Sequence, residues 1–229
     1  MTRAWPWVAV LALCVAIGAG LPAWSQARVA ARYPVTAADL AGGRADLARL
    51  AVRGRAPSTG YSREQFGQPW ADVDHNGCDT RNDVLARDLV DKRTRGDHCT
   101  VLTGTLDEPY TGEQEEFVRG PSSATVQIDH VVALADAWET GAQQWSAHKR
   151  LAFANDPANL LAVDGPANQD KGAGDAATWL PPNKGYRCVY VLRQIRVKAA
   201  YGLWATAAEH DAFARVLGRC VVAKQARSP

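Results

Sequence analysis

The segment Gln127-Ile128-Asp129-His130-Val131-Val132 places a carboxylate and an imidazole side by side at the end of a run that alternates apolar and polar residues. Two further segments follow it, Asn159-Leu160-Leu161 and then Asn168-Gln169-Asp170-Lys171-Gly172. The alternation predicts a strand that ends at Asp129, and the short apolar run after Asn159 predicts a second, buried strand. The chain therefore brings acidic, imidazole and amide groups to the ends of two strands.

These residue types match what the hydrolysis of a phosphodiester needs, which is a base, a cation and donors that hold the phosphate. His130 is the candidate base, because the pKa of an imidazole lies near neutrality. Neighbouring strand residues point to opposite faces, so Asp129 can bind a metal while His130 faces water. Asn168 adds a neutral oxygen, and this sparse ligation leaves a hard cation such as Mg²⁺ most of its shell for water and phosphate.

Other polar residues are candidates for supporting roles. Asn159 is predicted to hold the adjacent loop or to orient the His130 ring, and its alternative role is that of a turn or cap residue. Lys171 follows Asn168 by three residues, so it is predicted to reach a phosphate from the same helical face, unless it is only a solvated charge. A candidate phosphate-binding stripe, which could equally be a solvated helix face, consists of Arg187, Arg193 and Arg196.

The three segments resemble the HNH nucleases of the ββα-metal type, and more narrowly the secreted bacterial HNH proteins allied to the carboxy-terminal nuclease domain of the GmrSD restriction enzymes. The resemblance extends from about residue 60 to 217 and includes Gly60-Tyr61-Ser62-Arg63-Glu64, Gly77-Cys78-Asp79-Thr80-Arg81-Asn82-Asp83 and Thr178-Trp179-Leu180-Pro181-Pro182. It implies an α+β fold, in which a ββα-metal core at about residues 124–175 is embedded in a mostly helical, disulfide-stapled single domain.

The resemblance also implies roles for the site residues. Asp129 and Asn168 would bind a divalent cation, with His130 as general base and Asn159 as its support. Asn168 stands where the family name has its final histidine, and this change favours Mg²⁺ or Mn²⁺ over a zinc site rich in histidine. The expected activity is metal-dependent endonuclease action on DNA, with RNA as an alternative substrate. The alternative function is a secreted, non-catalytic module that binds nucleic acid or protein on the same scaffold.

The amino terminus predicts export. Arg3 precedes the uncharged apolar run from Trp5 to Leu21, and Ala23-Trp24-Ser25 offers small residues for cleavage, so residues 1–25 are interpreted as a signal peptide. The alternative is a retained membrane anchor, but the run is short for a membrane span and lacks a basic flank. We therefore expect a secreted protein without stable membrane association.

The rest of the chain is divided by composition. We expect a lead-in segment at 26–59, a candidate for mobility, then the nuclease domain at 60–220 and a tail at 221–229. Helices are predicted at 37–52, 82–92, 133–140, 145–154, 188–204 and 207–217. Strands are predicted at 99–106, 124–129 and 159–163. A chain of 229 residues with 47% apolar residues suits one compact domain, which we expect to be monomeric.

Cysteine usage agrees with export. Removal of the signal peptide deletes Cys14 and leaves an even set, namely Cys78, Cys99, Cys188 and Cys220. An even set in an oxidising compartment predicts two disulfides. Three pairings are possible and the sequence does not choose among them, although Cys78 with Cys99 and Cys188 with Cys220 would each close a local loop. The alternative, a zinc site of four thiolates, lacks the usual close Cys-x-x-Cys pairs.

Two further patterns bear on ligands. The formal net charge is +2, and it falls by one with the loss of Arg3, so any affinity for phosphate must be local. The stretch from Asp72 to Asp83 places oxygen-bearing side chains at alternate positions and Gly77 at the sixth, as at the start of a calcium loop. We favour the alternative interpretation, an Asp- and Asn-rich turn that caps the next helix.

Overall fold

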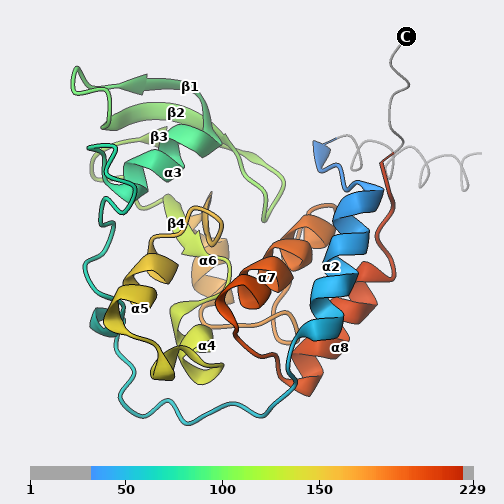
Figure 1. Ribbon diagram of the computed structural model, residues 1–229. Helices are drawn as coiled ribbons and strands as arrows, with labels where there is room; N and C mark the ends of the chain where they lie inside the picture. Colours follow the sequence, from blue (N-terminus) through green and yellow to red (C-terminus); the bar gives the residue numbers. More distant parts are fainter. Residues whose placement is uncertain (1–31, 224–229) are drawn as a thin grey trace, which may run out of the picture.

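The computed structural model describes residues 32–223, which form an α+β fold (Figure 1). The helices are α2 (Ala37–Arg49), α3 (Thr80–Asp88), α4 (Leu134–Glu139), α5 (Ala147–Ala154), α6 (Gly165–Lys171), α7 (Arg187–Tyr201) and α8 (Ala207–Leu217), with short 3-10 helices η1 (Arg63–Phe66) and η2 (Ala142–Gln144). The strands are β1 (Leu89–Thr94), β2 (Val101–Asp107), β3 (Gln114–Val118), β4 (Val126–His130) and β5 (Leu160–Asp164). The predicted signal peptide, including Cys14, lies outside the described residues.

The centre of the fold is a ββα unit made of β4, β5 and α6. The two strands pair antiparallel, with Asp129 opposite Leu161 and His130 opposite Leu160. Helix α6 begins directly after β5, because the Asp164 carboxylate accepts from the Ala167 amide at 2.7 Å and caps it. Gly165 is required at this junction, since a Cβ there would lie 2.6 Å from a backbone carbonyl oxygen of the segment before β4.

Strand β4 and the residues next to it lie between two hydrophobic cores. Val126 and Ile128 pack with α3 and the three-stranded sheet, and Val131 and Leu161 belong to the core around α7. In Figure 1 the sheet of β1, β2 and β3 lies at one end of the molecule, the helices α2, α7 and α8 lie at the other, and β4 lies between them.

The predicted helix at 82–92 is too long. Helix α3 ends at Asp88, and the next residues form β1, whose Leu89 lies opposite Leu106 of β2. Pairing with β2 and burial of Leu89 outweigh the local helical tendency. Strand β3 escaped prediction because only Phe117 is buried among its five residues, so its sequence shows no period of two. The other predicted helices and strands are present, with ends shifted by a few residues.

The described part of the lead-in segment is attached to the domain. Helix α2 packs against α7 and α8, and it begins with a capping box between Thr36 and Asp39. The chain after α2 follows the surface of the domain, where Arg53 donates its amide hydrogen to the Ala205 carbonyl and Ala56 donates to the Glu139 carbonyl. No helix within residues 32–223 has the length and apolar character that crossing a membrane requires.

Two disulfides join Cys78 to Cys99 and Cys188 to Cys220, which confirms the two local pairs. The first ties the start of α3 to the β1–β2 connection, and the second ties α7 to the segment after α8. The pairs are 21 and 32 residues apart in sequence. Both bridges therefore join elements that flank the ββα unit.

Removal of either disulfide is expected to lower the free energy of unfolding by about 3–4 kcal/mol, because loops of this length lose that much chain entropy when closed. The variants are Cys78→Ser with Cys99→Ser, and Cys188→Ser with Cys220→Ser, each measured by urea unfolding. A loss below about 1 kcal/mol in both double variants would contradict the expectation.

Candidate active site

A cavity of about 340 Å³ opens where β4 ends. Asp129, His130 and Asn168 all line it, so the structure brings the predicted base and both predicted metal ligands together. The segment before α3 contributes Tyr61 and Arg63 to the same cavity. Two residues from the end of β4 and one from α6 thus line the same cavity.

His130 is buried, with 8% of its surface exposed. Its Nε2 lies 2.8 Å from the carbonyl oxygen of Ala154, and a carbonyl only accepts, so Nε2 carries the proton and Nδ1 keeps a lone pair. Burial lowers the pKa of His130 to about 4. The imidazole is therefore neutral at pH 7 and has a nitrogen able to accept a proton.

Asp129, which lines the same cavity, is held by two donors. Its Oδ1 accepts from Lys171 Nζ at 2.8 Å, and its Oδ2 accepts from the Tyr110 hydroxyl at 2.5 Å. Burial and the nearby Asp129 carboxylate raise the pKa of Tyr110 well above its usual value, so this hydroxyl stays protonated. The position of the carboxylate is thereby fixed on both sides.

The donor types at Asp129 and Asn168 fit a hard divalent cation. Each carboxylate oxygen has two lone pairs, so the bonds from Tyr110 and Lys171 leave acceptor capacity toward the cavity. The amide nitrogen of Asn168 donates to Gln127 Oε1 at 2.9 Å, and this bond leaves its carbonyl oxygen as the free end of the side chain. One carboxylate and one amide oxygen are ligands of the kind that Mg²⁺ accepts.

Asn159 supports the chain beyond the histidine and does not touch the ring. Its Oδ1 accepts from the Val132 amide at 2.8 Å, and its Nδ2 donates to the Val132 carbonyl at 3.2 Å. Its own carbonyl accepts from the Val131 amide at 2.7 Å. Asn159 is fully buried, so three hydrogen bonds fix the path of the chain directly after His130.

Lys171 lies at the site but makes no contact with solvent. Its ammonium is fully buried and donates to Asp129 Oδ1 and to the His130 carbonyl oxygen, the latter at 3.0 Å. The sequence predicts that this ammonium contacts a phosphate, but in the structure it forms an ion pair with Asp129. The lysine therefore joins the end of α6 to the end of β4.

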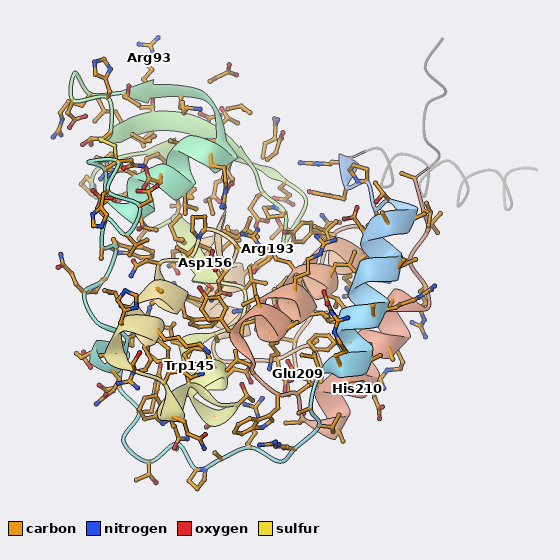
Figure 2. The ribbon with its side chains drawn as sticks, viewed as in Figure 1. Arg93, Trp145, Asp156, Arg193, Glu209 and His210 are labelled. Atoms are coloured by element: carbon orange, nitrogen blue, oxygen red, sulfur yellow. A yellow bond between two sulfur atoms is a disulfide. The ribbon has the colours of Figure 1, made fainter. Side chains whose placement is uncertain are left out.

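The three arginines of the predicted stripe do not line the His130 cavity. Each binds other parts of the protein: Arg187 donates to the Pro181 carbonyl, Arg193 to the carbonyls of Pro157, Ala158 and Leu160, and Arg196 to the Asp39 carboxylate. Figure 2 labels Arg193 close to Asp156 in the view, and both residues line a separate hollow over α7. Their role in substrate binding stays a prediction.

Comparisons with known proteins place the chain in a family. The family model described as GmrSD restriction endonucleases, C-terminal domain, matches residues 79–216. The chain belongs to this family. It is also 38% identical over 176 residues to a protein of Arthroderma benhamiae described as an uncharacterized secreted protein, a match that covers 76% of this chain and 82% of that protein. No solved structure matches the chain.

Three residues around the site of this GmrSD-family domain were not singled out from the sequence. Tyr110 comes from the connection between β2 and β3, and nothing in its local sequence predicts a bond to Asp129. Trp70 lies with its ring nearly parallel to that of His130, at 16° and a centroid distance of 6.4 Å. Arg63 lies in the quoted segment Gly60–Glu64, so the resemblance pointed to its neighbourhood without giving it a role.

A second acidic group in the GmrSD-family domain is Asp136, Asp175 and Glu209, which lie close enough together to surround a cation. Protein cations already occupy it: Arg55 contacts Asp136 and Asp175, at 2.8 and 2.6 Å, and Lys198 contacts Asp136 and Glu209, both at 2.8 Å. Figure 2 places Glu209 beside α7, away from the sheet. The arrangement is a buried charge network that joins the lead-in segment to α4, α7 and α8.

The predicted calcium-like stretch is an Asp-rich turn in the structure. The amide side chain of Asn76 donates to Asp74 and to Asp83, and the backbone amides of Asn76 and Gly77 donate to Asp72. Farther along, the Asp79 side chain caps α3 by accepting from the Asn82 amide at 2.8 Å. These bonds support the capping interpretation.

Proposed function

We propose that this protein is a secreted, metal-dependent endonuclease that hydrolyses phosphodiester bonds of DNA, with RNA as the alternative substrate. The observation that carries the proposal is the convergence of His130, Asp129 and Asn168 on one cavity. Membership of a nuclease family supports it. The predicted signal peptide, the two disulfides and the relative described as secreted support export.

The proposed reaction begins with a water molecule in the His130 cavity. Nδ1 of His130 accepts a proton from this water while the oxygen attacks phosphorus, and the Ala154 carbonyl holds the opposite side of the ring. The P–O3′ bond breaks and the departing 3′ oxygen takes up a proton from solvent water, so the products carry a 5′-phosphate and a 3′-hydroxyl. The neutral state of His130 at pH 7 makes it available as a base without prior deprotonation.

Asp129 and Asn168 would hold the divalent cation, Mg²⁺ or Mn²⁺, which when bound neutralises phosphate charge and stabilises the departing oxygen. Tyr110 and Lys171 orient the Asp129 carboxylate toward this task. Asn159 keeps the chain after His130 in place, so we propose it as a positioning residue.

A nicking assay tests the proposal. The oxidised mature protein is incubated with supercoiled plasmid and with RNA in Mg²⁺, Mn²⁺ or EDTA, and the new ends are identified by enzymatic labelling. We expect cleavage only with a divalent cation and 5′-phosphate products. Products with 3′-phosphates would contradict the mechanism. No cleavage of either polymer by a folded protein would favour the non-catalytic binding module.

A further inference from the structure

Arg63 is a charged residue on the cavity whose side chain has no hydrogen-bond or ion-pair partner among residues 32–223. Its side chain lines the cavity together with His130, and it also borders a smaller hollow between His130 and Trp70. Within residues 32–223 no ion pair involves Arg63, and its guanidinium makes no hydrogen bond. A guanidinium has five N–H donors, so all of them are available to a ligand.

The backbone that carries Arg63 is firmly held on both sides. Phe66 is buried and packs against Phe153, at the other end of η1. Tyr61 packs edge-on against Trp138 at a centroid distance of 6.1 Å. The Arg150 side chain also donates to the carbonyl oxygen of Gln65 at 2.7 Å. The fold therefore sets the position of the Arg63 backbone beside the cavity.

Two carboxylates bear on the charge of Arg63, that of Asp129 on the same cavity and that of Glu64, its neighbour in sequence. The Asp129 carboxylate already has its counterion in Lys171. The exposed Glu64 carboxylate accepts from the Ser62 hydroxyl, and the charge of Arg63 also lowers its pKa, but the two side chains form no ion pair. The cavity thus carries a cation whose side chain is not engaged in an ion pair among residues 32–223.

We propose that Arg63 binds a phosphate group of the nucleic acid substrate and holds it against His130. This proposal rests on the function proposed above and names the residue that takes the role predicted for Lys171. Two parallel N–H···O bonds from a guanidinium to the non-bridging oxygens would fix the phosphate in orientation as well as position. The buried Lys171 contacts Asp129 instead, so Arg63 is the cavity cation that a phosphate can reach.

A binding experiment tests this independently of cleavage. The His130→Ala variant in EDTA is titrated with a fluorescein-labelled eight-base-pair DNA duplex, and binding is followed by anisotropy at several salt concentrations. Addition of Arg63→Ala is expected to weaken binding about tenfold and to make the slope of log Kobs against log salt shallower by about 1. Arg44→Ala is the matched control, because Arg44 is an exposed residue of α2 outside the cavity lining.

The same substitution in the otherwise unaltered protein gives a second readout. Arg63→Ala should lower kcat/KM for plasmid cleavage about 100-fold, while Arg63→Lys recovers part of it. The Mn²⁺ affinity of Arg63→Ala should equal that of the unaltered protein. Unchanged duplex affinity and salt slope in Arg63→Ala would overturn the proposal, whereas absence of cleavage in the unaltered protein would overturn only the nuclease function.

Discussion

His130→Ala is expected to lower the rate of plasmid nicking at saturating Mg²⁺ by about 10³-fold, within the range that a positioned general base contributes. The variant removes the nitrogen that accepts the proton of water but leaves Asp129, Lys171 and Tyr110 in place. Single-turnover nicking rates measure the effect. His148→Ala is the matched control, because His148 is an exposed residue of α5 and does not line the cavity.

The loss must be separated from unfolding. His130→Ala leaves the Ala154 carbonyl without its hydrogen bond, which costs about 1–3 kcal/mol if water does not replace it. His130→Gln retains an amide donor and is expected to be stable but equally inactive, since an amide is not a base at pH 7. Nicking by either folded variant at the rate of the unaltered protein would rule out His130 as the base.

Lys171→Met is expected to lower the free energy of unfolding by about 3–5 kcal/mol, measured by urea titration in EDTA. The substitution leaves the buried Asp129 carboxylate with only the Tyr110 hydroxyl as donor. Lys184→Met is the matched control, because Lys184 is exposed and makes no ion pair within the described residues.

A double variant identifies the cause of this loss. Lys171→Met combined with Asp129→Asn removes both charges. The double variant should therefore lose clearly less free energy of unfolding than the two single variants lose in sum. The opposite pattern, a stable Lys171→Met with weakened duplex binding, would restore the prediction from sequence that Lys171 binds phosphate.

The site could be predicted from sequence only where its residues belong to the ββα unit. Asp129 and His130 are the last residues of β4, Asn159 directly precedes β5, and Asn168 lies on α6. Local pattern and resemblance were enough to name all four as candidates. Tyr110 could not be named in this way, because the connection that carries it reaches Asp129 only after the three-stranded sheet has packed against β4 and β5.

A second limit of prediction from sequence concerns the contacts of charged side chains, as Lys171 and the three arginines show. The sequence gives their charge and helical spacing, but burial decides what the charge contacts. Lys171 is enclosed beside Asp129, whereas Arg193 donates to the carbonyl of Ala158, before β5, and to that of Leu160, at its start. A long cationic side chain can reach in several directions, and its partner depends on which carbonyls and carboxylates the fold brings near.

The amino-acid sequence by itself determined the α+β class, the ββα segment, the family and the even set of cysteines, because these depend on local periodicity and on residue types in order. The tertiary structure decided the disulfide pairs, the end of α3 and the partners of the charged side chains around His130. Those features depend on contacts between residues that are distant in the chain, such as Lys171 with Asp129, and such contacts are set by packing and burial.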